Sequence, residues 1–126
     1  MAYGMKGLAL MKFGRYDEAV ECFDKALEID PSLAYVWMNR GNALDDWGEH
    51  KEAIKSYRNA LEIETDPYSI AEIWNNIGLC FLNMKDFPQA SESYDKALEI
   101  ERAVASLRTN ASDDVIGFVK SHTFFS

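Results

Sequence analysis

Apolar and small side chains recur along this chain at intervals of three and four residues, in blocks separated by short polar breaks. Trp37, Gly41 and Leu44 follow the rhythm of one helix, and the run 53–61 follows the rhythm of a second. Gly48 lies between them, where a glycine permits the left-handed backbone that often ends a helix. The pattern predicts two short amphipathic helices joined by a tight turn, which is a helical hairpin.

The same hairpin pattern occurs three times, beginning near Gly7, Gly41 and Gly78, at spacings of 34 and then 37 residues. The matching columns are Ala19, Ala53 and Ala90; Phe23, Tyr57 and Tyr94; Ala26, Ala60 and Ala97; Leu27, Leu61 and Leu98; and Leu10, Leu44 and Phe81. A further column holds Tyr3, Trp37 and Trp74, which we expect to point inward. One hairpin cannot bury both of its faces alone. Three hairpins are therefore predicted to stack on one another.

This period and these columns resemble the tetratricopeptide repeat. The resemblance covers residues 1–102, with units at about 1–33, 34–67 and 68–102. It implies an all-α fold, in which antiparallel helix pairs stack into a right-handed superhelix, or solenoid.

Two features depart from a regular repeat. Lys85 occupies the position that Gly48 holds in the second unit, and if it adopts the left-handed conformation of the glycines, this costs roughly 1 kcal/mol. Three extra residues, around 65–67, either lengthen the connection into the third unit or add one helical turn. Ser69 followed by Glu72 predicts a capping box where the next helix begins.

Residues 103–126 follow the repeats as a C-terminal extension. Because no proline stops the last repeat helix, we expect it to continue through 103–107 and to break at 110–112. A short helix over 113–120 would then cover the apolar face of the last unit as a capping helix, with a mobile end at 122–126. A frayed tail, or a segment that binds a neighbouring chain, is the alternative.

Composition and charge narrow the choice of partners. Apolar residues make up 48% of the chain and charged residues 27%, which is typical of a globular protein. The net charge of −8, from 21 acidic and 13 basic residues, disfavours both nucleic acid and anionic membrane surfaces as partners. No uninterrupted apolar stretch reaches the roughly 18 residues that a transmembrane helix needs.

Residues with catalytic or metal-binding chemistry are few and scattered. Cys22 and Cys80 have no metal-ligand spacing, so we expect free thiols in a cytoplasmic protein, with Cys22 half-exposed and Cys80 in the core. His50 shares a column with aromatic residues and is expected only to pack. Asp45 and Asp46 form a carboxylate pair on a solvated face or at a helix end. We therefore predict no catalytic residue, no metal site and no cofactor, and the chain is not expected to be an enzyme.

The first helix of each unit is expected to line the concave side of a stacked array. In the second and third units its outward residues form the predicted groove, which consists of Tyr35, Met38, Asn39, Asn42, Asp45, Glu72, Asn75, Asn76, Leu79 and Leu82. Met1, Gly4, Met5, Leu8 and Met11 continue this groove in the first unit. Amides offer both a donor and an acceptor to a peptide backbone, while Met and Leu offer adaptable apolar contact. The alternative is that Asn39 and Asn76 only bridge adjacent helices.

The family resemblance implies two ways in which such a groove could bind. Some co-chaperone repeat domains grip a C-terminal carboxylate with a Lys-Asn-Asn-Lys-Arg set, and the corresponding positions here are Gly4, Leu8, Asn39, Glu72 and Asn76. Only Asn39 matches, so that function is not expected. Asn39 and Asn76 are instead similar to the asparagine ladder of the O-linked N-acetylglucosamine transferase repeats, although Met5 occupies the first rung.

The predicted function is that of a protein–protein interaction scaffold or adaptor, which binds a peptide segment, with basic character favoured by Asp45 and Glu72, in the groove. The alternative is a structural, self-associating repeat fragment of a larger protein. A homo-oligomer could form through the open ends of the repeats, where Tyr3, Leu10 and Tyr16 have no preceding unit to cover them, or through the C-terminal extension.

Overall fold

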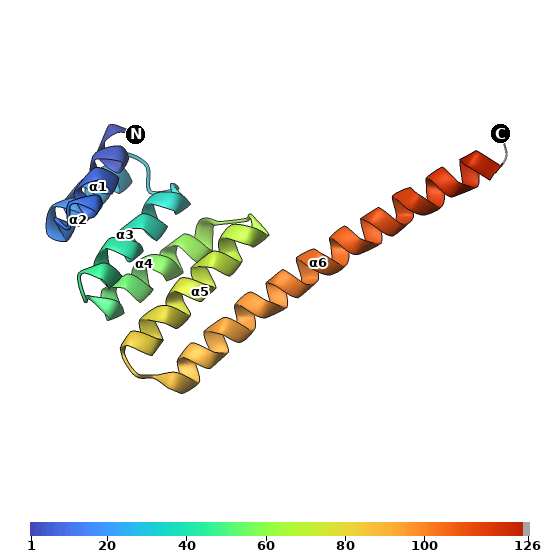
Figure 1. The fold of residues 1–126 in the computed structure, drawn as a ribbon. Coiled ribbons are helices and arrows are strands. Elements are labelled where there is room, and N and C mark those ends of the chain that lie inside the picture. The colour runs from blue at the N-terminus through green and yellow to red at the C-terminus, as the bar shows by residue number, and fades with distance from the viewer. Residues whose placement is uncertain (125–126) are drawn as a thin grey trace.

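Six helices, arranged as three antiparallel pairs, make up the computed structural model, which describes the backbone of residues 1–124 and the side chains of residues 1–108 (Figure 1). They are α1 (Ala2–Lys12), α2 (Tyr16–Ile29), α3 (Ala34–Asp46), α4 (His50–Ile63), α5 (Pro67–Asn83) and α6 (Phe87–Phe124). Within the described backbone there is no strand, and the predicted all-α stack of helix pairs is confirmed.

The turn inside each pair has the left-handed residue that the sequence pattern predicts. Gly14, Gly48 and Lys85 have φ angles of 75°, 92° and 62°. After each of them, the next backbone N–H returns to the last turn of the preceding helix, as in the 2.8 Å bond from Glu49 N to Leu44 O. Lys85 therefore holds a conformation that costs a residue with a Cβ roughly 1 kcal/mol.

A glycine in the first helix of each pair lies against an aromatic ring of the second helix. A Cβ placed on Gly41 would lie 2.6 Å from the Tyr57 ring, well inside van der Waals contact. The same distance is 2.5 Å from Gly7 to Phe23 and 2.9 Å from Gly78 to Tyr94. The aromatic rings at Phe23 and Tyr57 are almost completely buried. Close approach of the two helices therefore requires glycine at these positions.

The pairs stack because α2 packs on α3 and α4 packs on α5. Val36 and Ile73 are the residues that fill these junctions, with 0% and 1% of their surface exposed. The prediction that Tyr3, Trp37 and Trp74 point inward is wrong for Tyr3, which is exposed, whereas Trp37 and Trp74 are partly buried and pack against the core. Val36 and Ile73, one residue earlier, are the fully buried residues, and cations lie over the aromatic rings, as Lys96 does at 4.4 Å from Trp74.

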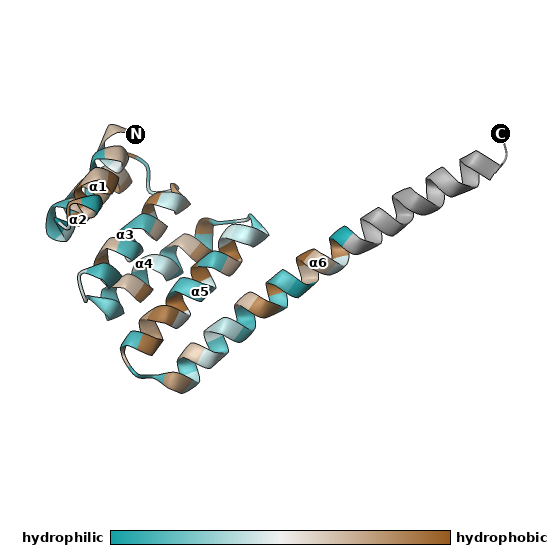
Figure 2. Cartoon of the chain, viewed as in Figure 1, coloured by the Kyte–Doolittle hydropathy of each residue, from teal (hydrophilic) through white to brown (hydrophobic). Residues whose placement is uncertain are grey.

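The start of α5 differs from the predicted capping box. The helix begins at Pro67, and the carboxylate of Asp66 accepts the backbone N–H of Ser69 at 3.1 Å. Ser69 is thus the third helical residue rather than the cap, because a proline with its fixed φ is well suited to the first helical position. The insertion lengthens the helix by about one turn from Pro67 onward, which gives α5 17 residues against 13 in α3. Figure 2 shows hydrophobic residues along much of α5, which lies between α4 and α6.

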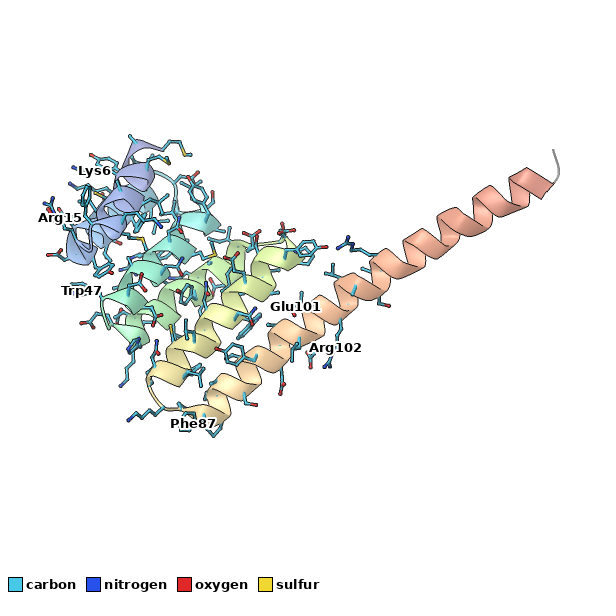
Figure 3. The ribbon with its side chains drawn as sticks, viewed as in Figure 1. Lys6, Arg15, Trp47, Phe87, Glu101 and Arg102 are labelled. Carbon is cyan, nitrogen blue, oxygen red and sulfur yellow. The ribbon has the colours of Figure 1, made fainter. Side chains whose placement is uncertain are left out.

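The last helix runs well past the repeats. α6 continues without interruption from Phe87 to Phe124, so the predicted break at 110–112 and the separate capping helix over 113–120 are wrong. Among the described residues α6 contacts only α5, and beyond Arg102 it projects away from the array (Figures 1 and 3). Polar residues such as Asn and Ser are only mildly unfavourable inside a helix, so they do not end it without a glycine or proline. Of the predicted mobile end 122–126, residues up to 124 are helical, and 125–126 lie outside the described part.

The glycine–aromatic contact gives a stability test. Gly41→Ala should lower the free energy of unfolding by about 1–2 kcal/mol, because overpacking outweighs the roughly 1 kcal/mol by which alanine favours a helix. Gly4→Ala is the matched control, because the nearest atom to a Cβ at Gly4 is a Val36 methyl at 4.0 Å. That change should stabilise the chain. Urea unfolding followed by circular dichroism measures both, and equal stabilisation by the two changes would contradict the packing described here.

Candidate functional site

The first helices of the three pairs form the inner layer of the array. α1 contacts α3, and α3 contacts α5, whereas no contact links α2 with α4 or α4 with α6 among the described residues. Helices that touch across the pairs lie on the side with the smaller radius. The concave side therefore belongs to α1, α3 and α5, which carry the predicted groove residues.

The predicted groove residues fall into three groups by exposure. Tyr35, Glu72, Leu79 and Leu82 are exposed. Met38, Asn39, Asn42, Asn75 and Asn76 are partly buried. Asp45 differs from the rest, because only 10% of its side chain is exposed. The structure thus presents apolar and amide side chains on the concave side, with one of the predicted carboxylates withdrawn.

Two of the predicted amides hold neighbouring helices together. The side-chain oxygen of Asn42 accepts a hydrogen bond from the Tyr57 hydroxyl and another, at 3.4 Å, from the Asn76 amide. These bonds link α3 with α4 and with α5. Burial, reinforced by nearby negative charges, raises the pKa of the Tyr57 phenol, so this hydroxyl remains a donor. Asn76 thus bridges α5 and α3, and its contact with a ligand stays a prediction.

Asn39 has a different environment. No hydrogen bond to its side chain occurs among residues 1–108, although the side chain is partly buried. It borders a cavity of about 250 Å³ on the concave side, lined by Leu8, Met11, Lys12, Asn39, Asn42 and Asp46. An amide without a protein partner beside such a cavity is available to a ligand.

The Asp45 carboxylate bonds to neighbouring side chains inside the protein. Its carboxylate lies 2.7 Å from the Nδ1 atom of His50 and accepts a bond from the Cys80 thiol at 3.2 Å. The prediction that Asp45 faces a ligand is therefore wrong, and His50 does more than pack, because it orients this carboxylate. Burial, together with the Asp45 carboxylate, raises the pKa of the Cys80 thiol. Cys22, predicted to be half-exposed, is also buried, and both thiols are free.

Asp46 and Lys12 border the cavity although sequence reasoning did not place them in the groove. Burial and the neighbouring charge of Asp45 raise the pKa of the Asp46 carboxyl. The Asp45–Asp46 pair was visible in the sequence. Successive side chains on a helix point about 100° apart, however, so only one of the two carboxylates can face the concave side, and the sequence pattern did not show which one. Nothing in the sequence marked Lys12 as a groove residue, apart from its position at the end of the first helix.

Neither a metal site nor a membrane span is apparent. In the part of the chain whose side chains are described, no three His, Cys, Asp or Glu residues gather closely enough to hold a metal ion. None of the described helices is both long and apolar enough to cross a bilayer.

A family model named tetratricopeptide repeat matches the chain at residues 1–33, 34–66 and 71–103, which covers most of its length. The chain belongs to the tetratricopeptide repeat family. Each matched repeat contains one helix pair, and the third begins within α5, after the added turn.

Solved tetratricopeptide structures share this architecture. A crystal structure of MamA is 26% identical, with a TM-score of 0.76, and the match covers 83% of this chain and 60% of that one. The Sgt2 domain from Aspergillus fumigatus is 29% identical over 79% of this chain and 64% of its own, with a TM-score of 0.70. This chain therefore spans less than two thirds of the length of either protein. The N-terminal domain of STI-1 from C. elegans, 23% identical over 85% of this chain and 92% of its own, has the same fold, with a TM-score of 0.73. No curated protein matches the sequence.

Unfolding measurements can distinguish an amide that stabilises the fold from one that is free to bind a ligand. Asn42→Ala should lower the free energy of unfolding by about 1–3 kcal/mol, because it leaves the buried Tyr57 hydroxyl without its acceptor. Asn39→Ala should change it by no more than about 0.5 kcal/mol. Thermal or urea unfolding of the two variants compares them directly, and similar losses of stability would contradict this assignment.

The thiol of Cys80 should behave as a buried group. A free cysteine reacts faster with thiol reagents as the pH rises through about 8.5, because the thiolate is the reactive form. Cys80 has a raised pKa, so in a Cys22→Ser chain its labelling should stay slow across this range and become fast only on unfolding. A native labelling rate that climbs with pH as a free thiol's does would contradict the buried position.

Proposed function

We propose that this chain is a protein-interaction module whose concave face, formed by α1, α3 and α5, binds a peptide segment of another protein. The family supports the general role, because tetratricopeptide repeats are typically protein-interaction domains. The observation that carries the finer proposal is Asn39, which presents an amide without a protein partner at the edge of the concave cavity. A peptide backbone supplies both the donor and the acceptor that such an amide needs.

The cavity lining suggests the chemistry of the ligand. Leu8 and Met11 supply apolar walls, and Leu79 and Leu82 add exposed apolar surface further along the concave side. Asp46 lies at the cavity and Glu72 is exposed on α5, so the favoured peptide combines an apolar side chain with a Lys or Arg. In this ligand preference Asp46 replaces Asp45, the carboxylate predicted from the sequence.

The peptide proposed here differs from the one seen in some structural neighbours. Two repeat domains of Spaghetti (RPAP3), 20% and 23% identical to this chain, were solved with the HSP90 peptide SRMEEVD, and this likeness concerns the fold alone. Where co-chaperone domains of that type place cations, this chain has Gly4, Glu72 and Asn76. We infer that an acidic peptide ending in a carboxylate is not its ligand.

The compartment is also a proposal. Two buried thiols that form no disulfide with each other fit a reducing environment. We therefore assign the chain to the cytoplasm.

The binding test uses synthetic peptides chosen by selection from a random displayed library against the wild-type chain. Selected peptides should pair an apolar residue with Lys or Arg, and Asn39→Ala should weaken them about tenfold, because it removes a directed hydrogen bond from the contact. Fluorescence anisotropy with labelled peptides measures the dissociation constant. SRMEEVD should show no binding above background.

The matched control is Asn59→Ala. Asn59 is a partly buried amide on α4, beside a cavity of about 550 Å³ on the outer layer. This variant should bind the selected peptides as the wild type does. Equal weakening by both variants, or weakening by Asn59→Ala alone, would place binding away from the concave side, provided that circular dichroism shows both variants folded.

A further inference from the structure

The junction between the first two helix pairs contains an ion pair centred on Arg40. Arg40 of α3 donates from Nε to the Asp24 carboxylate of α2 at 2.7 Å, and from Nη1 to the Ser56 hydroxyl at 2.6 Å. Beside this contact lie Leu27 of α2 and Trp37 of α3, which border the same outer cavity as the ion pair. An acid and a leucine on one helix thus meet a cation and an aromatic ring on the next.

The repeat places the same four chemical types at the two ends of the array. At the N-terminal end, Tyr3 and Lys6 of α1 occupy the columns of Trp37 and Arg40, and we call this pair the leading face. At the C-terminal end, Asp95 and Leu98 of α6 occupy the columns of Asp24 and Leu27, and we call this pair the trailing face. The junction between the second and third pairs lacks this ion pair, since Arg58 and Ile77 fill the two charged columns.

Both end faces are exposed in the structure. Tyr3 is 41% and Leu98 is 42% exposed, whereas Leu27, the internal counterpart of Leu98, is 7% exposed. Lys6 and Asp95 are exposed as well, and neither has an ion-pair partner among residues 1–108. Figure 3 shows Lys6 and Arg15 on the first helix pair, at the opposite end of the array from α6.

The course of α6 leaves the trailing face accessible. A capping helix that folded back would cover Asp95 and Leu98. Instead α6 contacts only α5 among the described residues, and it continues in a straight line past Glu101 and Arg102 (Figures 1 and 3). The surface that would receive a further helix pair is therefore open.

We propose that the trailing face of one copy docks on the leading face of a second copy, with Asp95 paired to Lys6 and Leu98 packed against Tyr3. The occupant is a second copy because this chain carries both halves of the contact that α2 and α3 make internally, with matching charges. Two different faces meet, so the contact is heterologous, and association continues beyond a dimer into an open stack or a ring as the concentration rises. The contact is small, so the expected dissociation constant lies between about 10 µM and about 1 mM.

Sedimentation velocity on the full chain and its charge variants tests this docking. The mean mass of the wild type should rise with concentration and pass the dimer value. Lys6→Glu should raise the dissociation constant about tenfold, because it replaces an attraction with a repulsion. Combining it with Asp95→Lys should restore association, since the reversed pair again has opposite charges.

Two controls separate this contact from other causes of association. Lys12→Glu changes the net charge as much as Lys6→Glu does, but Lys12 borders the concave cavity, so association should persist. Leu107→Glu alters an exposed apolar residue on the projecting part of α6 and should also have no effect. A wild-type chain that stays monomeric to about 1 mM would overturn the proposal. So would equal effects of Lys6→Glu and Lys12→Glu, or a double variant that fails to regain association while its circular dichroism is unchanged.

Discussion

The close approach of two helices inside each repeat is the constraint on which the rest of the molecule depends. It exists because Gly7, Gly41 and Gly78 leave room for an aromatic ring where any other residue would place a Cβ. The ring fixes how each first helix is rotated about its axis. That rotation buries Val36 and Ile73 at the junctions between repeats and turns Asn39 toward the concave side.

The same rotation divides the polar side chains of the inner layer between stability and binding. Asn42 accepts hydrogen bonds from Tyr57 and from Asn76, so these two amides link three helices. Asp45 is likewise held by His50 and Cys80. Asn39 is left with a partly buried amide that no other residue among 1–108 bonds to, and the proposed ligand contact rests on it. A surface can thus carry several asparagines of which some link helices, as Asn42 and Asn76 do.

Repetition explains which features the sequence could predict. Positions that recur three times, such as Gly7, Gly41 and Gly78, identified the helices, their pairing and the stack. Features that occur only once were harder to predict, because no second copy of the pattern shows which local conformation the chain adopts. Asp66 caps α5 although Ser69 has a suitable pattern, and α6 passes the polar run at 110–112 without a break. Within the groove, the exchange of Asp45 for Asp46 follows from a rotation of one residue, which periodicity alone does not resolve.

The central claim is that α1, α3 and α5 bind a ligand while α2, α4 and α6 support them. Mapping the amide chemical-shift changes of the isotope-labelled chain on addition of a selected peptide tests it most directly. The account predicts the largest changes around Leu8, Met11 and Asn39, with small changes along α2 and α4. Changes centred instead on the outer cavity, near Trp37 and Asn59, would contradict it.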